Sequence, residues 1–281
     1  MIKTPRPSAM RILPSATTVL AICAGLTSIK FALDGRPHIA LALIGASAVL
    51  DGIDGGIARA LDAQSRMGAE IDSLADAVNF GVAPALVIYV TLLPTSPVGW
   101  IFALLYAVCI VLRLARFNAL LDDNTQPAYT RQYFVGMPAP CGAVGVVGLL
   151  AAMLQFGHGW WTSPWFVCFW FAANATLLVS RVPTLALKSV SMPPNAAPIL
   201  LILIAAAAAA LLLFPYILVL LIIAGYVCII PFTIRSQRWV AARPEAWDDA
   251  PKQRRAARRA NRRDQPKRRS MSRLGLRKPG G

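Results

Sequence analysis

The chain has 281 residues, of which 57% are hydrophobic and 15% charged, and its mean hydropathy is +0.57. This composition excludes an ordinary soluble domain and indicates a polytopic membrane protein. The formal net charge is +15, and most of it lies in residues 235–281, where 16 Lys or Arg residues against 4 Asp or Glu residues give +12. We expect this basic tail to be disordered.

Eight apolar stretches are candidates to cross a bilayer, which takes about 20 residues for each helix. They cover residues 12–33, 38–58, 73–93, 98–115, 136–156, 165–180, 196–213 and 216–234. The last two are divided at Phe214-Pro215, because residues 196–234 are too long for a single span. The expected fold is therefore all-α, a polytopic membrane helical bundle with about eight transmembrane helices.

Lys and Arg residues predict the orientation of these helices, because short loops rich in them stay in the cytoplasm. The basic segments are the N-terminus, residues 113–131, residues 181–188 and the tail, whereas residues 95–99, 157–164 and 214–215 contain no Lys or Arg. With eight spans, the basic segments share one side except for the turn at Arg36. Both termini are then cytoplasmic, and we expect a multi-pass protein of the plasma membrane.

The basic tail and the five cysteines, which all lie in apolar segments, were also considered as functional sites. The basic tail can act as a clamp on anionic lipid headgroups or as a solvated segment that keeps the C-terminus in the cytoplasm, and the sequence leaves both open. Nucleic acid is not an expected partner, because residues 252–278 contain no aromatic residue. The five cysteines form no CxxC pair, which favours structural thiols over zinc ligands.

Four aspartates flank the connection between the second and third expected spans: Asp51, Asp54, Asp72 and Asp76. The first two are three residues apart and the last two are four apart, so each pair shares one face of a helix. Acidic groups at membrane depth are costly and usually mark a working site. If the two faces meet, carboxylates about 4 Å apart repel by about 4 kcal/mol at an effective dielectric of about 20, and cations must be present to hold them.

Only carboxylates are offered as ligands here, which favours a hard cation such as Mg²⁺, Mn²⁺ or Ca²⁺. Four acids suit two metal ions, and paired ions serve to bridge phosphates in an in-line displacement. Gly55, Gly56 and Gly68 leave room for a bulky ligand near the backbone, and Arg59 could neutralise a phosphate. The alternative, a structural salt-bridge network, is disfavoured because one arginine cannot neutralise four aspartates.

The run D-x2-D-G-x2-A-R-x8-G-x3-D-x3-D resembles the signature of the CDP-alcohol phosphatidyltransferases, which are integral membrane enzymes of phospholipid synthesis. Its fixed positions are occupied by Asp51, Asp54, Gly55, Ala58, Arg59, Gly68, Asp72 and Asp76. The resemblance implies that residues 12–234 form a transmembrane domain of this family. Residues 1–11 would then be a cytoplasmic N-terminus and residues 235–281 the cytoplasmic tail.

The resemblance also implies roles for the residues of the signature. One metal ion, Mg²⁺ or Mn²⁺, would be held by Asp51, Asp54 and Asp72, and a second by Asp51, Asp72 and Asp76. Asp76 would also be the catalytic base for the incoming hydroxyl. The CDP-linked lipid would be bound by Gly55, Arg59, Ser65 and Gly68. The chemistry of the family displaces CMP from such a lipid by an alcohol.

Three further segments resemble the branch of the family that uses L-serine as the acceptor: Asp72–Pro84, Arg113–Asn118 and Phe134–Pro138. One departure is Pro14-Ser15, where the family would have Pro-Asn. The partners implied are CDP-diacylglycerol, L-serine and the lipid bilayer. A serine pocket needs a cation for the carboxylate, and the candidates for serine binding are Asn79, Arg113 and Arg116.

Other functions were weighed against this one. A sister enzyme that uses glycerol phosphate or inositol phosphate would carry the same signature. A divalent-cation transporter would also place acids in the membrane, but it has no need for the glycine and arginine positions. The sequence contains no signal for or against a homodimer. The active site is expected to face the cytoplasm in either enzyme.

Overall fold

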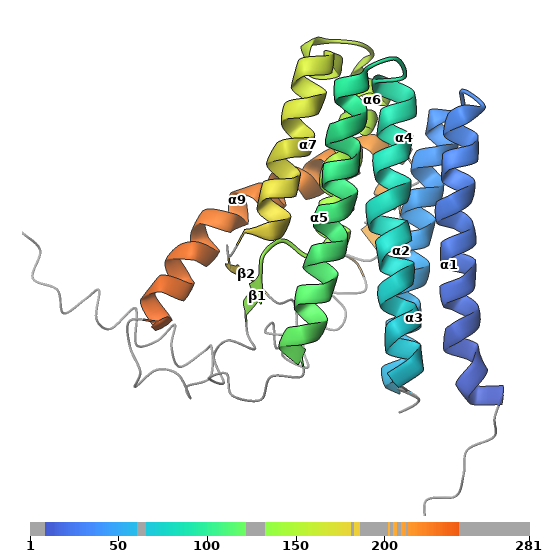
Figure 1. Ribbon diagram of the computed structural model, residues 1–281, viewed down its shortest axis with the longest axis vertical. Coiled ribbons are helices and arrows are strands. Elements are labelled where there is room, and N and C mark those ends of the chain that lie inside the picture. The colour runs from blue at the N-terminus through green and yellow to red at the C-terminus, as the bar shows by residue number, and fades with distance from the viewer. Residues whose placement is uncertain are drawn as a thin grey trace, which may run out of the picture.

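The computed structural model describes residues 9–60, 66–121, 133–180, 183–185 and 213–241, together with a few isolated positions between 202 and 211. Most of its helices run side by side, and the last one crosses them obliquely (Figure 1). The longer helices are α1 (Ala9–Leu33), α2 (Pro37–Ala60), α3 (Arg66–Asp76), the π-helix η1 (Ala77–Val82), α4 (Ala83–Leu92), α5 (Pro97–Leu121), α6 (Ala139–Phe156), α7 (Pro164–Val179) and α9 (Pro215–Ala241). A single 3₁₀ turn, η3 (Trp160–Thr162), precedes α7.

Proline and glycine set the helix boundaries. α2, α5, α7 and α9 each begin at a proline, whose fixed φ suits the first turn of a helix and whose missing N–H is not needed there. The connection between α1 and α2 is a tight turn in which Gly35 has a φ of +70°. This turn returns α2 directly along α1, and the two helices pack against each other over much of their length.

The inner face of α1 is built from small residues. They are Thr18, Ala21, Gly25, Ser28 and Ala32, all buried and spaced three or four apart. Small side chains let helix backbones approach closely, which is how membrane helices gain packing energy without a hydrophobic driving force. This face accepts α2 on one side and the α3–η1–α4 segment on the other.

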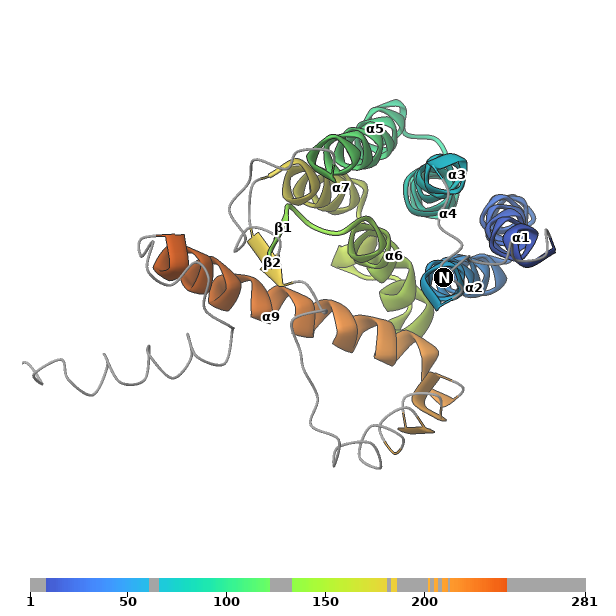
Figure 2. The same cartoon turned by 90° about the horizontal axis from the view of Figure 1, so that it is seen from below.

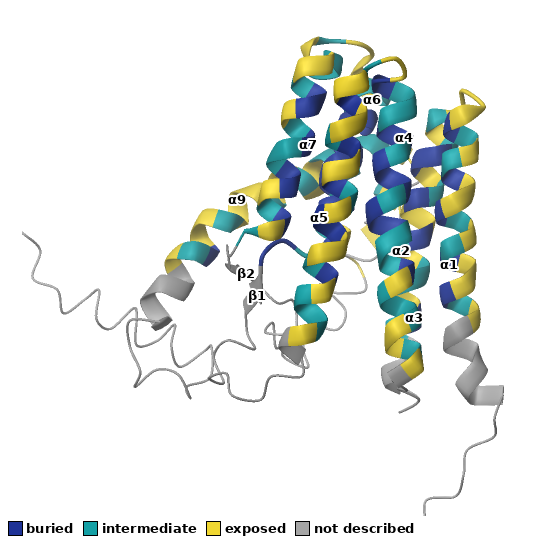
Figure 3. Ribbon diagram, in the orientation of Figure 1, coloured by how far each residue is buried: buried dark blue, intermediate teal, exposed yellow. Residues whose placement is uncertain are grey.

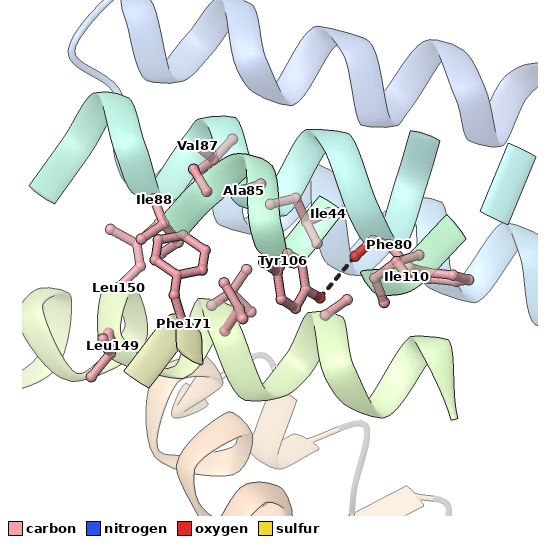
Figure 4. Close-up of a cluster of buried hydrophobic side chains, with 14 of the residues drawn as sticks. Ile44, Phe80, Ala85, Val87, Ile88, Tyr106, Ile110, Leu149, Leu150 and Phe171 are labelled. Atoms are coloured by element: carbon pink, nitrogen blue, oxygen red, sulfur yellow. Dashed lines mark hydrogen bonds between the residues drawn. The ribbon is translucent and has the colours of Figure 1, made fainter. Parts of the chain in front are cut away.

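The centre of the bundle is an apolar cluster around Tyr106 of α5 (Figure 4). Tyr106 is fully buried, and its ring lies 5.8 Å from that of Phe171 on α7. Its hydroxyl donates a 2.9 Å hydrogen bond to the backbone carbonyl of Phe80 in η1. The π-helix therefore offers a carbonyl to a neighbouring helix, and the bond fixes η1 against α5.

Six helices within the described residues are long and apolar enough to span a membrane: Ala16–Leu33, Pro37–Gly56, Met67–Leu92, Pro97–Ala119, Ala139–Phe156 and Pro215–Arg235. α7 is apolar but shorter. Many positions on the outer faces of the helices are exposed (Figure 3), and many of them carry large apolar side chains, as a lipid-facing bundle requires. Every expected span except 196–213 corresponds to one of these helices, and that one lies mostly outside the described residues.

The third expected span differs in its start. It was placed at residue 73, but the helix already begins at Arg66 and continues through η1 to Leu92. Asp72 and Asp76 therefore lie within a continuous helix rather than at its first turn. The search for long apolar stretches missed this start because α3 is polar and contains too few apolar residues to look like a membrane span.

The expected all-α class is confirmed, and the helical bundle carries one short antiparallel ribbon. β1 (Tyr133–Val135) and β2 (Pro183–Leu185) form an antiparallel ribbon with Phe134 opposite Thr184. Gly136 follows β1 with a φ of +85°, and a Cβ at this residue would lie 2.7 Å from the Leu178 carbonyl oxygen. Only glycine fits this close approach, so the ribbon is docked on the end of α7.

α9 crosses the side of the bundle next to α6 and β2 (Figure 2). It contacts α6 through Ile223, whose side chain occupies the space that a Cβ on Gly148 would take. Much of the helix is exposed, but Thr233 and the hydroxyl of Tyr226 are buried against the bundle. α9 thus presents one narrow inner face to the protein.

Candidate active site

The structure brings carboxyl groups of α2 and α3 together. The side chains of Asp51 and Asp76 lie within hydrogen-bonding range of each other. Asp54 lies near Asp51, and Asp72 lies near Asp76, close enough in each case for the charges to interact. The two helical faces predicted from spacing therefore meet at Asp51 and Asp76.

Asp54 is held from the neighbouring helix α1. It is 5% exposed, and its Oδ2 accepts a hydrogen bond from the Thr18 hydroxyl. Its other oxygen, Oδ1, is buried and has no hydrogen-bond partner in the described part of the chain, and the same is true of Oδ1 of Asp76. Buried carboxylate oxygens without a partner are costly, so these two atoms are suited to an external ligand.

The donor set fits a hard divalent cation, because it offers only carboxylate oxygens and two of them lack a protein partner. No three acidic, His or Cys side chains among the described residues converge into a complete ligand set. The carboxylates are gathered as neighbouring pairs along two helices, and a bound ion would have to draw them together.

Arg113 of α5 reaches the same cluster from the opposite side. Its guanidinium interacts electrostatically with Asp76, and it lies 5.3 Å from the ring centre of Phe117 on its own helix. Two residues that the sequence did not assign to the site, Cys141 of α6 and Tyr226 of α9, are also within electrostatic range of Arg113.

Arg116 is directed elsewhere. Its Nη1 donates a 3.3 Å hydrogen bond to the carbonyl of Val179, the last residue of α7. This carbonyl has no partner within its own helix, so Arg116 satisfies a helix terminus. The two arginines of one motif thus have different surroundings: Arg113 interacts with Asp76, and Arg116 binds the end of α7.

Two hydrogen bonds bracket the Asp76–Arg113 pair. On one side, Asn118 of α5 donates a 2.9 Å bond from Nδ2 to the Ser73 hydroxyl of α3. On the other side is the bond from Tyr106 to the Phe80 carbonyl. Because α3–η1 and α5 run antiparallel, these bonds fix their relative register and so the height of Asp76 against Arg113. Asn118 belongs to the segment Arg113–Asn118 that the sequence analysis singled out, but nothing in the sequence indicated Ser73 as its partner.

Asn79 lies one turn beyond Asp76 in the π-helix. It is 0% exposed, and neither its Oδ1 nor its Nδ2 has a hydrogen-bond partner among the described residues. Its side chain lies against Gly25 of α1, at the position that a Cβ on Gly25 would occupy. π-helices often occur at functional sites. Here the π-helix places the buried amide of Asn79 against α1.

The residues expected to bind the CDP-linked lipid are described only in part. Gly55 and Gly68 are half-buried, and a Cβ on Gly56 would meet nothing within 4 Å. Arg59 lies in the last turn of α2, but its side chain is outside the described residues, as is all of Ser65. This end of α2 therefore leaves open space beside the aspartates.

A helical membrane bundle with paired aspartates on two adjacent helices and a guanidinium opposite them defines the class of this protein. The chain belongs to the CDP-alcohol phosphatidyltransferase family, whose family model matches residues 11–170.

Its relatives make the comparison more specific. It is 65% identical over 271 residues, covering 96% of this chain and 95% of the relative, to the CDP-diacylglycerol–serine O-phosphatidyltransferase of Mycobacterium tuberculosis (strain ATCC 25618 / H37Rv). It is 62% identical to the protein of the same name from Mycobacterium leprae (strain TN), over 96% of this chain and 90% of the relative. The Bacillus subtilis (strain 168) protein of that name is 37% identical over 53% of this chain and 78% of the relative.

Proposed function

We propose that this chain transfers the phosphatidyl group of CDP-diacylglycerol to L-serine, which gives phosphatidylserine and CMP. The observation that carries the proposal is the joining of Asp51 and Asp76 with Arg113 beside them. This arrangement combines an acidic group able to take a proton with a cation able to bind the carboxylate of an amino acid. The names of the relatives that match nearly the whole chain support the same acceptor.

The proposed reaction is a single displacement at phosphorus. The serine hydroxyl gives its proton to the Asp76 carboxylate while its oxygen forms a bond to the lipid-linked phosphorus. The bond from that phosphorus to the bridging oxygen of the diphosphate breaks, and CMP leaves with the electron pair. Asp76 is well suited to this role because it lies between the other carboxylates and Arg113.

Asp51, Asp54, Asp72 and Asp76 are proposed to hold two divalent cations, Mg²⁺ or Mn²⁺. Such ions would supply positive charge that offsets the negative charge developing on the leaving CMP. Arg59 would contribute a further positive charge to the diphosphate. Gly55, Ser65 and Gly68 are proposed to contact the CDP portion.

Arg113 is the first choice for the serine carboxylate because its guanidinium lies beside Asp76. Arg116 and Asn79 remain proposals for the same pocket. The hydrogen bond of Arg116 to Val179 makes it a weaker candidate, whereas the buried amide of Asn79 has both a donor and an acceptor to offer.

We infer a multi-pass plasma-membrane enzyme of eight spans with both termini in the cytoplasm and the aspartates at the cytoplasmic side. Residues 1–11 would form the cytoplasmic N-terminus, residues 12–234 the catalytic transmembrane domain and residues 235–281 the basic cytoplasmic tail. A homodimer is compatible with the extensive apolar outer surface, which lipid alone would also cover.

The proposal is tested with the purified full-length chain, CDP-diacylglycerol, Mn²⁺ and radiolabelled acceptors. Labelled L-serine should enter a lipid that migrates as phosphatidylserine, and CMP should appear in equal amount. Label entering lipid from glycerol phosphate or inositol phosphate but not from serine would assign the chain to a sister enzyme. Uptake of Mn²⁺ into liposomes without any nucleotide would instead indicate a transporter.

A further inference from the structure

A proline and a tyrosine from different helices shape the π-helix η1. The π pattern runs to the end of η1, where the Ala83 N–H donates to the Val78 carbonyl, five residues back. Residue 84 would donate the next bond, to the carbonyl of Asn79 in the π pattern or of Phe80 in the α pattern. Pro84 has no N–H, so neither bond can form. The helix therefore lacks one backbone hydrogen bond at this point.

Tyr106 of α5 supplies a donor here. Its hydroxyl gives a 2.9 Å hydrogen bond to the Phe80 carbonyl, and both residues are fully buried in the apolar core (Figure 4). A proline inside a continuous helix also clashes with the carbonyl four residues back, which here is that of Phe80. A π-turn gives this carbonyl room to turn outward, and the Tyr106 hydroxyl meets it there. Pro84 and Tyr106 thus stabilise the same local widening of the helix.

The widened turn changes the direction in which Asp76 points. A π-turn contains about one more residue than an α-turn, and each residue of an α-helix takes up about 100°. Asp76 and Ile88 are 12 residues apart. An uninterrupted α-helix would separate their directions by about 120°, whereas the π-turn reduces this angle to about 20°. Because Ile88 is 1% exposed and lies in the core, the π-helix turns Asp76 toward the buried side of its helix.

Two observations on α3 agree with this direction. The Oδ1 atom of Asp76 is buried, although α3 is a polar segment. Ser73, one turn before Asp76, receives a 2.9 Å hydrogen bond from Asn118 of α5. Rotation of α3 by about 100° would carry both side chains away from these positions. The direction of α3 is therefore set from beyond its own end, by the turn that contains Phe80.

We propose that Tyr106 is a positioning residue, which orients the proposed base by holding the π-turn in place. Pro84 has the complementary role, because the N–H that it lacks would let the helix close into a regular α-turn. Neither side chain has to touch a substrate for this purpose. The assignment takes Asp76 as the base and so rests on the proposed function.

The first test is a cross-link that requires no turnover. Ser73→Cys and Asn118→Cys are combined in the full-length chain, with the five native cysteines replaced by alanine, and the protein is oxidised in micelles. A disulfide should form readily, because the two native side chains are in contact. Adding Pro84→Ala restores an N–H at residue 84 and should slow disulfide formation at least tenfold, since α3 then rotates. Pro97→Ala is the matched control, because Pro97 begins α5, where an N–H is not needed.

The second test measures the kinetics of transfer to L-serine. Tyr106→Phe keeps the ring against Phe171 and removes only the hydroxyl. Its kcat should fall about tenfold, the size expected when a buried carbonyl loses its partner. The KM values for serine and CDP-diacylglycerol should stay within about twofold, because no substrate contact changes. Tyr89→Phe is the matched control, since Tyr89 lies further along the same helix beside Trp100 and should leave all three constants unchanged.

The two tests together separate positioning from general damage. Pro84→Ala should lower kcat at least as much as Tyr106→Phe does, but without lowering the free energy of unfolding, because it restores a helical hydrogen bond. A Pro84→Ala protein that cross-links as fast as its parent, or a folded Tyr106→Phe protein with wild-type kcat, would overturn the inference. If Pro84→Ala does not fold, Tyr106→Phe carries the cross-link test too, with a smaller decrease in rate. A wild type that does not use serine would refute the proposed function, while the cross-link still decides whether the π-turn orients α3.

Discussion

Substitution of Thr18 tests whether a hydrogen bond from α1 orients the Asp54 carboxylate toward a ligand. The Thr18 hydroxyl donates to Oδ2 of Asp54 from the neighbouring helix, and Oδ1 is left without a partner in the described part of the chain. This bond holds one oxygen toward α1 and so turns the other away from it. Thr18→Val keeps the shape of the side chain but removes the donor.

The size of the effect follows from the burial of the pair. Thr18 and Asp54 are each 5% exposed, so water cannot replace the lost hydroxyl. A hydrogen bond to a charged group contributes about 1.5–3 kcal/mol, which corresponds to about a 10- to 150-fold change in an equilibrium constant. Loss of a residue that orients a metal ligand typically weakens metal affinity by about 10- to 100-fold. Both routes predict at least a tenfold loss, because Asp54 is then free to rotate away from Asp51.

The assay is a titration of the purified full-length protein with Mn²⁺, in which the EPR signal of free Mn²⁺ reports binding without any turnover. Thr27→Val is the matched control, since Thr27 lies on the same helix but is exposed and donates to the Cys23 carbonyl. The control should bind Mn²⁺ as wild type does. A folded Thr18→Val protein with wild-type Mn²⁺ affinity would show that Thr18 does not orient a metal ligand.

Three further predictions concern the same region. Asp76→Asn should lower turnover by about 10²–10⁴-fold with the fold intact, because the amide cannot accept the serine proton; near-normal turnover would remove Asp76 as the base. Full chelation with EDTA should abolish transfer, and added Mn²⁺ should restore it, whereas activity that survives chelation would contradict the metal requirement. Gly25→Ala should lower the free energy of unfolding by about 1–3 kcal/mol, because its methyl group overlaps Asn79. Gly45→Ala, where a Cβ meets nothing within 4 Å, is the control in the same denaturant titration in micelles.

The helical bundle was predictable because membrane spans need long apolar runs, and few other structures tolerate them. The acidic pairs were predictable because residues three or four apart share a helical face. From that spacing the sequence also suggested that the two faces meet, and Asp51 and Asp76 do. Their roles in metal binding and proton transfer remain predictions.

Long-range partners could not be predicted in the same way. Thr18 contacts Asp54 across 36 positions, and Asn118 contacts Ser73 across 45. Neither pairing has a local pattern, because each depends on which helices become neighbours. The divergence of Arg113 and Arg116 has the same origin, since a three-residue separation fixes their angle on α5 but not what surrounds them.

The spacing of the proposed base and the proposed acceptor cation is controlled by the register of two helices. The hydrogen bond between Asn118 and Ser73 lies on one side of Asp76 and Arg113. The hydrogen bond from Tyr106 to the Phe80 carbonyl lies on the other side. A helix that slid by one residue would move by about 1.5 Å and break both bonds, one of which is fully buried. The π-helix contributes to this arrangement because it presents the Phe80 carbonyl to Tyr106 directly after the turn that carries Asp76. The two hydrogen bonds therefore set the height of the proposed base, Asp76, against the proposed acceptor cation, Arg113.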